Sequence, residues 1–285
     1  MTAPPTRTQL EGYEELAAEL SYLAGAEIEQ SLGREIAVRY KGGSGTPRSG
    51  DPVSEVDHHV ETLIRARIGE VYPDHHIIGE EFGARGNTEH PVVWAIDPID
   101  GTSNFINGLP VFAASIGVLV HGAPVAGALW CASTHVLRPG VYSAHRGGAL
   151  RFDGADMVRR ENENVYRRLV GVPRVDDPRE HPFDTRKTGS AAAECAFVAA
   201  GLMAGATFAQ PFVWDIAGGV VLVEAAGGVV RTHTDGAWRD LASFRSAEGT
   251  SNTALAHWRQ PVAVGEREAV DTLIAQMAPG HPPHG

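Results

Sequence analysis

The segment Trp94-Ala-Ile-Asp97-Pro98-Ile99-Asp100-Gly101-Thr102-Ser103-Asn104-Phe105 determines both the fold and the chemistry expected of this chain. It follows directly on an apolar run of the kind that forms a buried strand. Pro98 restricts Asp97 to extended backbone angles, and Gly101 permits a sharp change of direction. Thr102 and Ser103 favour the start of a helix. The pattern predicts a strand, a turn and a helix, with both aspartates at the turn.

The two carboxylates of this segment converge at the end of the predicted strand, where the backbone N–H groups of Gly101 and Thr102 can face an anion. Taken alone, Asp-Pro and Asp-Gly are also ordinary turn dipeptides. A second acidic pair, Glu80-Glu81, follows Gly79 at the end of another apolar run. Adjacent glutamates alone are typical of a solvated loop, but two acidic clusters at strand ends favour a functional site.

A third acidic position lies far along the chain, in the segment Phe212-Val-Trp214-Asp215-Ile-Ala-Gly218-Gly219. An aspartate just before an apolar helix is usually its N-cap. Its role changes if the fold brings Asp215 to the other carboxylates. Oxygen ligands from Asp and Glu, without His or Cys, suit magnesium or manganese rather than zinc. The sequence therefore favours a hard-cation site.

Composition limits the partners of the chain. The 285 residues are 43% hydrophobic and 21% charged, as in globular enzymes, and the net charge is -11. This acidity argues against nucleic acid or an anionic membrane as a partner. An anionic substrate then requires a basic pocket or bound metal ions. No apolar run reaches the length of a membrane span and the N-terminus lacks a signal layout, so we expect a cytoplasmic protein.

Apolar periodicity predicts the elements around these motifs. Helices are expected over residues 13–38 and 54–70, separated by a Gly/Pro-rich mobile loop over 41–52, and strands over 77–78, 92–96, 112–120, 125–131 and 140–144. After a polar segment at 159–168, strands over 170–172, 207–212 and 229–230 alternate with helices over 191–204 and 216–226. We therefore expect an α+β half (1–158) carrying most metal ligands and an α/β half (159–285) carrying the last ligand and the substrate loop.

Cysteines and histidines offer no competing site. Cys131 and Cys195 have no paired spacing, so we expect both to be buried thiols. The pairs His58-His59 and His75-His76 place one ring of each pair away from the other, so we expect solvent exposure rather than zinc binding.

In this order and at these separations, the motifs G-E-E, D-P-I-D-G-T-S-N-F and W-D-I-A-G-G resemble the inositol monophosphatase family of lithium-sensitive phosphatases, over about residues 26–230. The resemblance implies an α/β, layered α+β fold: a five-layer αβαβα sandwich of the inositol monophosphatase and fructose-1,6-bisphosphatase type. It also implies an active site between the halves, and a homodimer.

The resemblance assigns roles residue by residue. It implies that Glu80, Asp97 and the carbonyl of Ile99 hold one Mg²⁺, that Asp97, Asp100 and Asp215 hold a second, and that Glu80 contributes to a weaker third; Mn²⁺ is an alternative and Li⁺ an inhibitor. Thr102 and Glu80 would position and deprotonate the attacking water, and Asp57 would orient the threonine hydroxyl.

The substrate contacts are implied in the same way. The scissile phosphate would lie against Asp100, Gly101, Thr102 and the loop residue Lys41. The substrate loop would be Gly189, Ser190 and Ala191, and a helix-start role for Ser190 is compatible with this.

One position departs from the family pattern. Inositol-specific members have a glutamate seven residues before the W-D aspartate, and this chain has Phe208 there, with no acidic residue between 196 and 214. A missing buried partner costs roughly 1–3 kcal/mol, so tight inositol specificity is not expected. We expect Mg²⁺-dependent hydrolysis of a small phosphate monoester. Alternatives are a histidinol-phosphate phosphatase, a fructose-1,6-bisphosphatase, a 3′(2′),5′-bisphosphate nucleotidase, or a non-catalytic phosphosugar-binding regulator.

Overall fold

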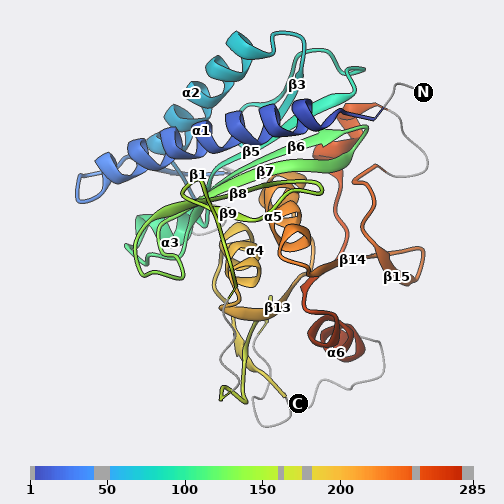
Figure 1. Ribbon diagram of the computed structural model, residues 1–285. Helices are drawn as coiled ribbons and strands as arrows, with labels where there is room; N and C mark the ends of the chain where they lie inside the picture. Colours follow the sequence, from blue (N-terminus) through green and yellow to red (C-terminus); the bar gives the residue numbers. More distant parts are fainter. Residues whose placement is uncertain (1–3, 42–51, 160–163, 175–181, 246–250, 278–285) are drawn as a thin grey trace.

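Five layers of helices and sheets make up the computed structural model, which describes residues 4–41, 52–159, 164–174, 182–245 and 251–277 (Figure 1). Two long helices cover the outer face of the first sheet, two helices lie between the sheets, and one covers the far face of the second sheet. In order, these helices are α1 (Arg7–Ser31), α2 (Glu55–Val71), α4 (Ala191–Ala199), α5 (Val213–Ala225) and α6 (Arg267–Met277). The expected αβαβα sandwich is confirmed.

The first sheet has eight strands in the order β10-β9-β8-β7-β6-β5-β3-β4. Its bounds are β3 (His76–Gly79), β4 (Gly83–Arg85), β5 (Val92–Asp100), β6 (Ala113–Val120), β7 (Ala123–Cys131), β8 (Gly140–His145), β9 (Arg151–Phe152) and β10 (Ala155–Asp156). Only β3 and β5 pair in parallel; the other pairings are antiparallel. Helices cover both faces of the central strands, which explains why β5 to β8 are almost continuously apolar.

The second sheet has six strands in the order β12-β11-β13-β16-β14-β15. Its bounds are β11 (Leu169–Gly171), β12 (Asp184–Arg186), β13 (Met203–Phe208), β14 (Val229–Thr234), β15 (Ala237–Asp240) and β16 (Val262–Gly265). A separate pair, β1 (Val38–Tyr40) with β2 (Pro52–Ser54), and the short helices α3 (Thr102–Ile106) and η2 (Asn252–His257) complete the chain. The largest apolar cluster includes α4, α5 and strands of both sheets, so the halves share a core. The boundary at 158–159 stays a prediction.

The first helix was predicted too far along the chain. It begins after Thr6, whose hydroxyl accepts from the Gln9 N–H while the Gln9 side chain accepts from the Thr6 N–H, and it ends at Ser31. This capping box lies before the apolar stripe on which the prediction rested. Of the loop predicted over 41–52, positions 42–51 lie outside the described residues.

The second half shows larger boundary errors. The predicted helix 191–204 ends at Ala199, and the predicted strand 207–212 is β13, Met203–Phe208, which pairs with β16. Both elements are buried on all sides, so their apolar run carries neither a helical nor a strand period. Helix α5 begins at Val213, three residues before the predicted start at Ile216.

Candidate active site

The end of β5 carries the two central aspartates. Asp97 pairs with Ser115 and Asp100 with Ala113, and the register of β5 against β6 shifts between them. Gly101 then adopts a φ of 92°, and α3 begins at Thr102. An L side chain is strained at this angle, and a Cβ on Gly101 would lie 3.2 Å from the Val111 carbonyl oxygen. The predicted strand, turn and helix are confirmed.

Asp97 is the most deeply buried of the four carboxylates Glu80, Asp97, Asp100 and Asp215. Its side chain is 2% exposed, and its Oδ1 accepts a hydrogen bond from the Ile99 N–H at 3.0 Å. Burial raises the pKa of Asp97 well above its ordinary value, and the nearby charges of Glu80, Asp100 and Asp215 raise it further. The fold therefore brings four carboxylates from three distant segments within electrostatic range of one another.

Asp100 joins the two halves of the molecule. Its Oδ2 accepts from the Ser190 hydroxyl at 2.5 Å and from the Ala192 N–H at 2.6 Å. Ser190 is also the N-cap of α4, because its Oγ accepts from the Ala193 N–H at 3.1 Å. Burial raises the pKa of Asp100 to about 7, although the bonds from Ser190 and Ala192 oppose this. The predicted substrate loop is thus fixed directly to a site carboxylate.

Asp215 is the third residue of α5, where the sequence had favoured its N-cap. Phe212 is the N-cap, and Asp215 Oδ2 accepts from the Phe212 N–H at 2.8 Å. This bond satisfies one of the free donors of the helix start. Burial raises the pKa of Asp215 well above its ordinary value, and Asp100 contributes to the rise. The Ser115 hydroxyl donates to the Trp214 carbonyl at 2.8 Å, which ties the helix start to β6.

Lys41 lies against the acidic turn after β3. Its Nζ is 2.6 Å from Glu80 Oε1 and 2.6 Å from Glu81 Oε1. Burial lowers the pKa of Lys41, but the bonds to Glu80 and Glu81 outweigh it, so the pKa lies above the ordinary lysine value. The ammonium therefore stays charged and offsets part of the negative charge. The predicted contact of Lys41 with phosphate stays a prediction.

Thr102 and Asp57 lie beside the carboxylates. The Thr102 hydroxyl is 3.2 Å from Asp57 Oδ1 and 2.9 Å from the Ile99 carbonyl oxygen. Asp57 Oδ2 accepts from the Ser54 N–H at 2.8 Å and the Ser54 hydroxyl at 2.5 Å. Burial raises the pKa of Asp57 to about 6, although the bonds from Ser54 lower it. The hydroxyl has one proton, which points toward these two acceptors. The lone pairs of the hydroxyl oxygen therefore remain able to accept a hydrogen bond.

Sequence reasoning missed the ion pair under the Glu80-Glu81 turn. Glu61, fully buried, accepts from the Glu81 N–H at 2.8 Å and from Arg65 at 2.7 Å. A Cβ on Gly79 would overlap the Glu61 carboxylate, so the glycine leaves room for this support. The spacing of Glu61 and Arg65, one helical turn apart on the apolar side of α2, was the available signal.

Two further residues support the substrate loop and were not assigned from the sequence. The Asn104 amide donates to the Val111 carbonyl at 2.6 Å and the Thr188 carbonyl at 2.7 Å. Glu194 Oε1 accepts from the Thr188 hydroxyl at 2.6 Å and the Thr188 N–H at 3.3 Å. Burial raises the pKa of Glu194 to about 7, opposed by these bonds. Asn104 lies inside the quoted motif, whereas nothing marks Glu194.

The histidine expectation was half right. His58 and His59 are 48% and 58% exposed, but His76 is fully buried on β3 and His75 accepts from the Trp94 indole N–H at 3.0 Å. Pairing of β3 with β5 buries His76, and the adjacency of the two histidines in the sequence does not reveal this. Cys131 and Cys195 are buried free thiols, as expected.

The donor set fits a hard cation. Within the described ranges no three His, Cys, Asp or Glu side chains are arranged as a complete metal-ligand group. The charge of Glu80 nevertheless lies close enough to raise the pKa values of Asp97, Asp100 and Asp215. The bonds from Ser190 and Ala192 to Asp100, and from Phe212 to Asp215, engage Oδ2 of each carboxylate. Crowded carboxylates with oxygen donors only suit magnesium.

Comparison with known proteins identifies the family of the chain. The model of the inositol monophosphatase family matches residues 9–263. An inositol-1-monophosphatase from Synechocystis sp. is 32% identical over 242 residues, covering 79% of this chain and 80% of that protein. Nus factor SuhB from Escherichia coli (strain K12) is 34% identical over 207 residues, covering 66% and 74%. The inositol monophosphatase structure from Anabaena (Nostoc) sp. PCC 7120 covers 96% of this chain and 98% of its own, with a TM-score of 0.69 at 24% identity, and supports the fold.

The family match and the relatives indicate a phosphatase that acts on small-molecule phosphate esters. The chain belongs to the inositol monophosphatase family. Among the residues that the structure describes, none of the helices has the length and apolar character needed to cross a membrane.

Proposed function

We propose that the protein hydrolyses a small-molecule phosphate monoester in a Mg²⁺-dependent reaction. The observation that carries the proposal is the convergence of Glu80, Asp97, Asp100 and Asp215, beside a threonine hydroxyl held by a buried aspartate. Carboxylates this close together need nearby positive charge to stay ionised at the same time. A phosphate ester also needs positive charge to approach them. Bound cations satisfy both requirements.

The proposed ligand assignment is the one that the resemblance to the inositol monophosphatase family implies. Glu80, Asp97 and the Ile99 carbonyl would hold one ion, and Asp97, Asp100 and Asp215 a second, with a third ion at Glu80 and Mn²⁺ as alternatives to the two-Mg²⁺ form. When bound, these ions lower the pKa of water and stabilise the charge that develops on the ester oxygen. Li⁺ is expected to inhibit.

The chain's own groups orient the reaction. The Thr102 hydroxyl, directed by Asp57 and the Ile99 carbonyl, would accept a hydrogen bond from the attacking water, and Glu80 would take its proton. The backbone N–H groups of Gly101 and Thr102, with Lys41, would face the phosphate oxygens. The loop Gly189-Ser190-Ala191, fixed to Asp100 by Ser190, would contact the rest of the substrate.

The substrate is proposed to be other than a tightly held inositol phosphate. Phe208 is 7% exposed and packs in the apolar cluster between the sheets, so this position offers a polyol no acceptor. Histidinol phosphate or a range of sugar phosphates fits better. The homodimer and the cytoplasmic location stay predictions.

A substrate panel tests the proposal. Phosphate release is measured from inositol 1-phosphate, histidinol phosphate, fructose 1,6-bisphosphate and adenosine 3′,5′-bisphosphate, with Mg²⁺ and with chelator, for the wild type and Asp97→Asn. Turnover is expected only for the wild type with Mg²⁺. Full activity in chelator or in Asp97→Asn would sink the metal mechanism. No turnover of any ester would instead favour the phosphosugar-binding regulator.

A further inference from the structure

An arginine from the second half lies on the aromatic start of α5. The Arg259 guanidinium lies over the face of the Phe212 ring, and Phe212 stacks on Trp214 with ring centroids 4.5 Å apart. Phe212 is 37% exposed, and its N–H donates to Asp215 Oδ2 at 2.8 Å. Arg259 comes from the segment between η2 and β16. One residue, Phe212, therefore connects this cation to a site carboxylate.

Arg259 has hydrogen-bonding capacity to spare. One of its terminal nitrogens donates to the Trp258 carbonyl at 2.7 Å. Among the described side chains, no carboxylate oxygen lies within ion-pair distance of its guanidinium, so Asp215 acts on it only at longer range. A guanidinium has five N–H donors in a planar fork that matches phosphate and carboxylate. Stacking on an aromatic face fixes the plane of that fork.

The surroundings of Arg259 also favour an anion. The segment 196–214, which leads into α5, contains no acidic residue, and Phe208 turns its ring into the core. This segment therefore adds no negative charge at the start of α5. A neutral polyol would gain little binding energy from the Arg259 guanidinium, whereas an oxyanion would form a charge-assisted hydrogen bond with it.

We propose that Arg259, held on Phe212, binds a second oxyanion of the substrate, distinct from the phosphate that is hydrolysed. This inference rests on the proposed function and narrows it to phosphate monoesters that carry a further phosphate or carboxylate. The competing role is that Arg259 only offsets the charge of Asp215. That role would affect every substrate equally, whereas an oxyanion subsite affects only substrates with a second negative group.

Matched substrate pairs separate the two roles. Fructose 1-phosphate is compared with fructose 1,6-bisphosphate, and glycerol 3-phosphate with 3-phosphoglycerate, so that each pair differs by one phosphate or one carboxylate. Arg259→Met keeps the apolar stem on Phe212 and removes the charge. We expect it to raise KM for the doubly anionic member of at least one pair by about 10- to 100-fold, with kcat and the singly anionic member changed by less than about twofold.

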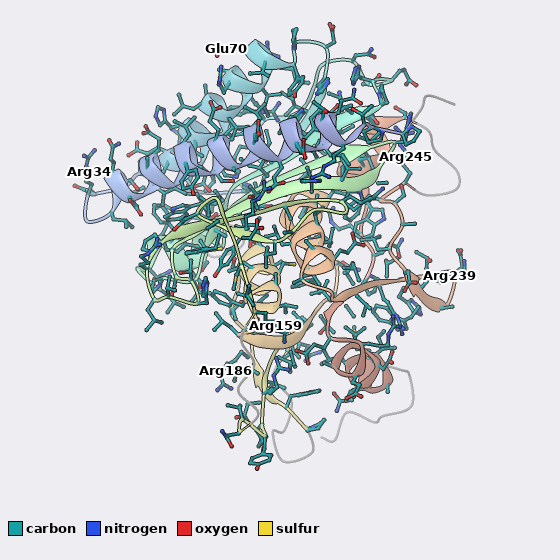
Figure 2. All side chains as sticks on the ribbon, in the orientation of Figure 1. Arg34, Glu70, Arg159, Arg186, Arg239 and Arg245 are labelled. Carbon is teal, nitrogen blue, oxygen red and sulfur yellow. The ribbon has the colours of Figure 1, made fainter. Side chains whose placement is uncertain are left out.

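Two further variants control the experiment. Arg259→Lys keeps the charge without the fork, so the KM for the doubly anionic ester should lie between those of the wild type and Arg259→Met. Arg239→Met removes an exposed arginine from β15, which Figure 2 shows at the edge of the second sheet, and should leave both pairs unchanged. Thermal unfolding of all variants identifies any that fail to fold, in which case Arg259→Lys decides the result.

Each outcome has a distinct meaning. An equal loss on both members of a pair assigns Arg259 to Asp215 and overturns the subsite, as does an unchanged KM or a wild type that hydrolyses only the singly anionic esters. Turnover of the singly anionic esters in any of these cases leaves the proposed function intact. Absence of Mg²⁺-dependent turnover of these four esters and of every ester in the substrate panel rejects the proposed function, and the subsite with it.

Discussion

The end of β5 and the start of α5 contribute to the same site, but they are built differently. At the end of β5, strand pairing and the Ile99 N–H fix the position of Asp97, and its side chain is buried. At the start of α5, Phe212 is partly exposed and the cation on it comes from another segment. The end of β5 is suited to catalytic groups whose positions must be fixed. Side chains at the start of α5 can be substituted without moving the end of β5.

Asp97→Asn should produce the largest effect, because it removes the carboxylate proposed to bridge both cations. We expect phosphate release to fall by about a thousandfold or more for every substrate. In chelator the variant should unfold at the same temperature as the wild type or higher, since the charged form of Asp97 is disfavoured by burial and by its neighbours.

Phosphate release measures the predicted loss of activity, and thermal unfolding in chelator measures the predicted unfolding temperature. The control is Asp240→Asn, at an exposed position on β15, which should change neither. If Asp97→Asn lost turnover of only one ester, the end of β5 would be a specificity element and the contrast with α5 would fail.

Thr102→Val should have the next largest effect, because it removes the hydroxyl between Asp57 and the Ile99 carbonyl and keeps the shape of the side chain. A fall in kcat of about a hundredfold or more is expected, with KM changed little. Steady-state kinetics on two unrelated esters measure this. Thr102→Ser should restore most of the rate. A variant that raised KM and kept kcat would show a binding role instead.

Ser190→Ala affects the contact between the two regions. It removes the N-cap of α4 and one of the bonds to Asp100, which should lower the free energy of unfolding by about 1–2 kcal/mol. Thermal or denaturant unfolding and kcat/KM are measured, and activity should fall about tenfold. Ser251→Ala removes the N-cap of η2 and should cost stability without activity. Equal activity in the two variants would contradict a role for Ser190 in the site.

Glu194→Gln should give the smallest effect, and it depends on pH. Burial raises the pKa of Glu194 to about 7, so the folded state favours the protonated form. The corresponding stability is present at low pH and is lost as pH rises through about 7. In chelator, the Tm of the wild type should therefore fall between about pH 5 and 8 by a few degrees more than that of Glu194→Gln. Parallel pH profiles would show that Glu194 is not the group responsible.

Local sequence determined most of the first half of the site. The order strand, Asp-Pro, Gly and helix-starting Thr specifies a turn whose geometry depends on neighbouring residues only. The resemblance to the inositol monophosphatase family led to the pairing of Asp57 with Thr102, whose side-chain oxygens the structure places 3.2 Å apart. Reasoning from local sequence was less successful where the bounds of an element or the burial of a residue depend on tertiary packing. β13 and α4 are buried on all sides, so their boundaries carried no period, and His76 is covered by strand pairing.

Long-range partners lay beyond sequence reasoning. Arg259 reaches Phe212 only because the segment before β16 returns to α5, and no local pattern records that path. Glu194 resembles any helix residue until the fold buries it against Thr188. The carboxylates were found because Glu80, Asp97 and Asp100 follow apolar runs and Asp215 lies at the start of an apolar helix. The residues that support them are distributed without such markers.

The bond between Asp100 and the loop at Ser190 determines where the substrate preference of the protein can be redesigned. Because Asp100 Oδ2 is engaged by the Ser190 hydroxyl and the Ala192 N–H, a single aspartate belongs to the acidic cluster and also holds the second half in place. A substitution on either side of this contact is therefore expected to disturb both the acidic cluster and the loop at Ser190. The side chains of Phe212 and Arg259 take no part in this contact. A redesign of substrate preference is therefore best directed at Phe212 and Arg259, with the contact at Asp100 left in place.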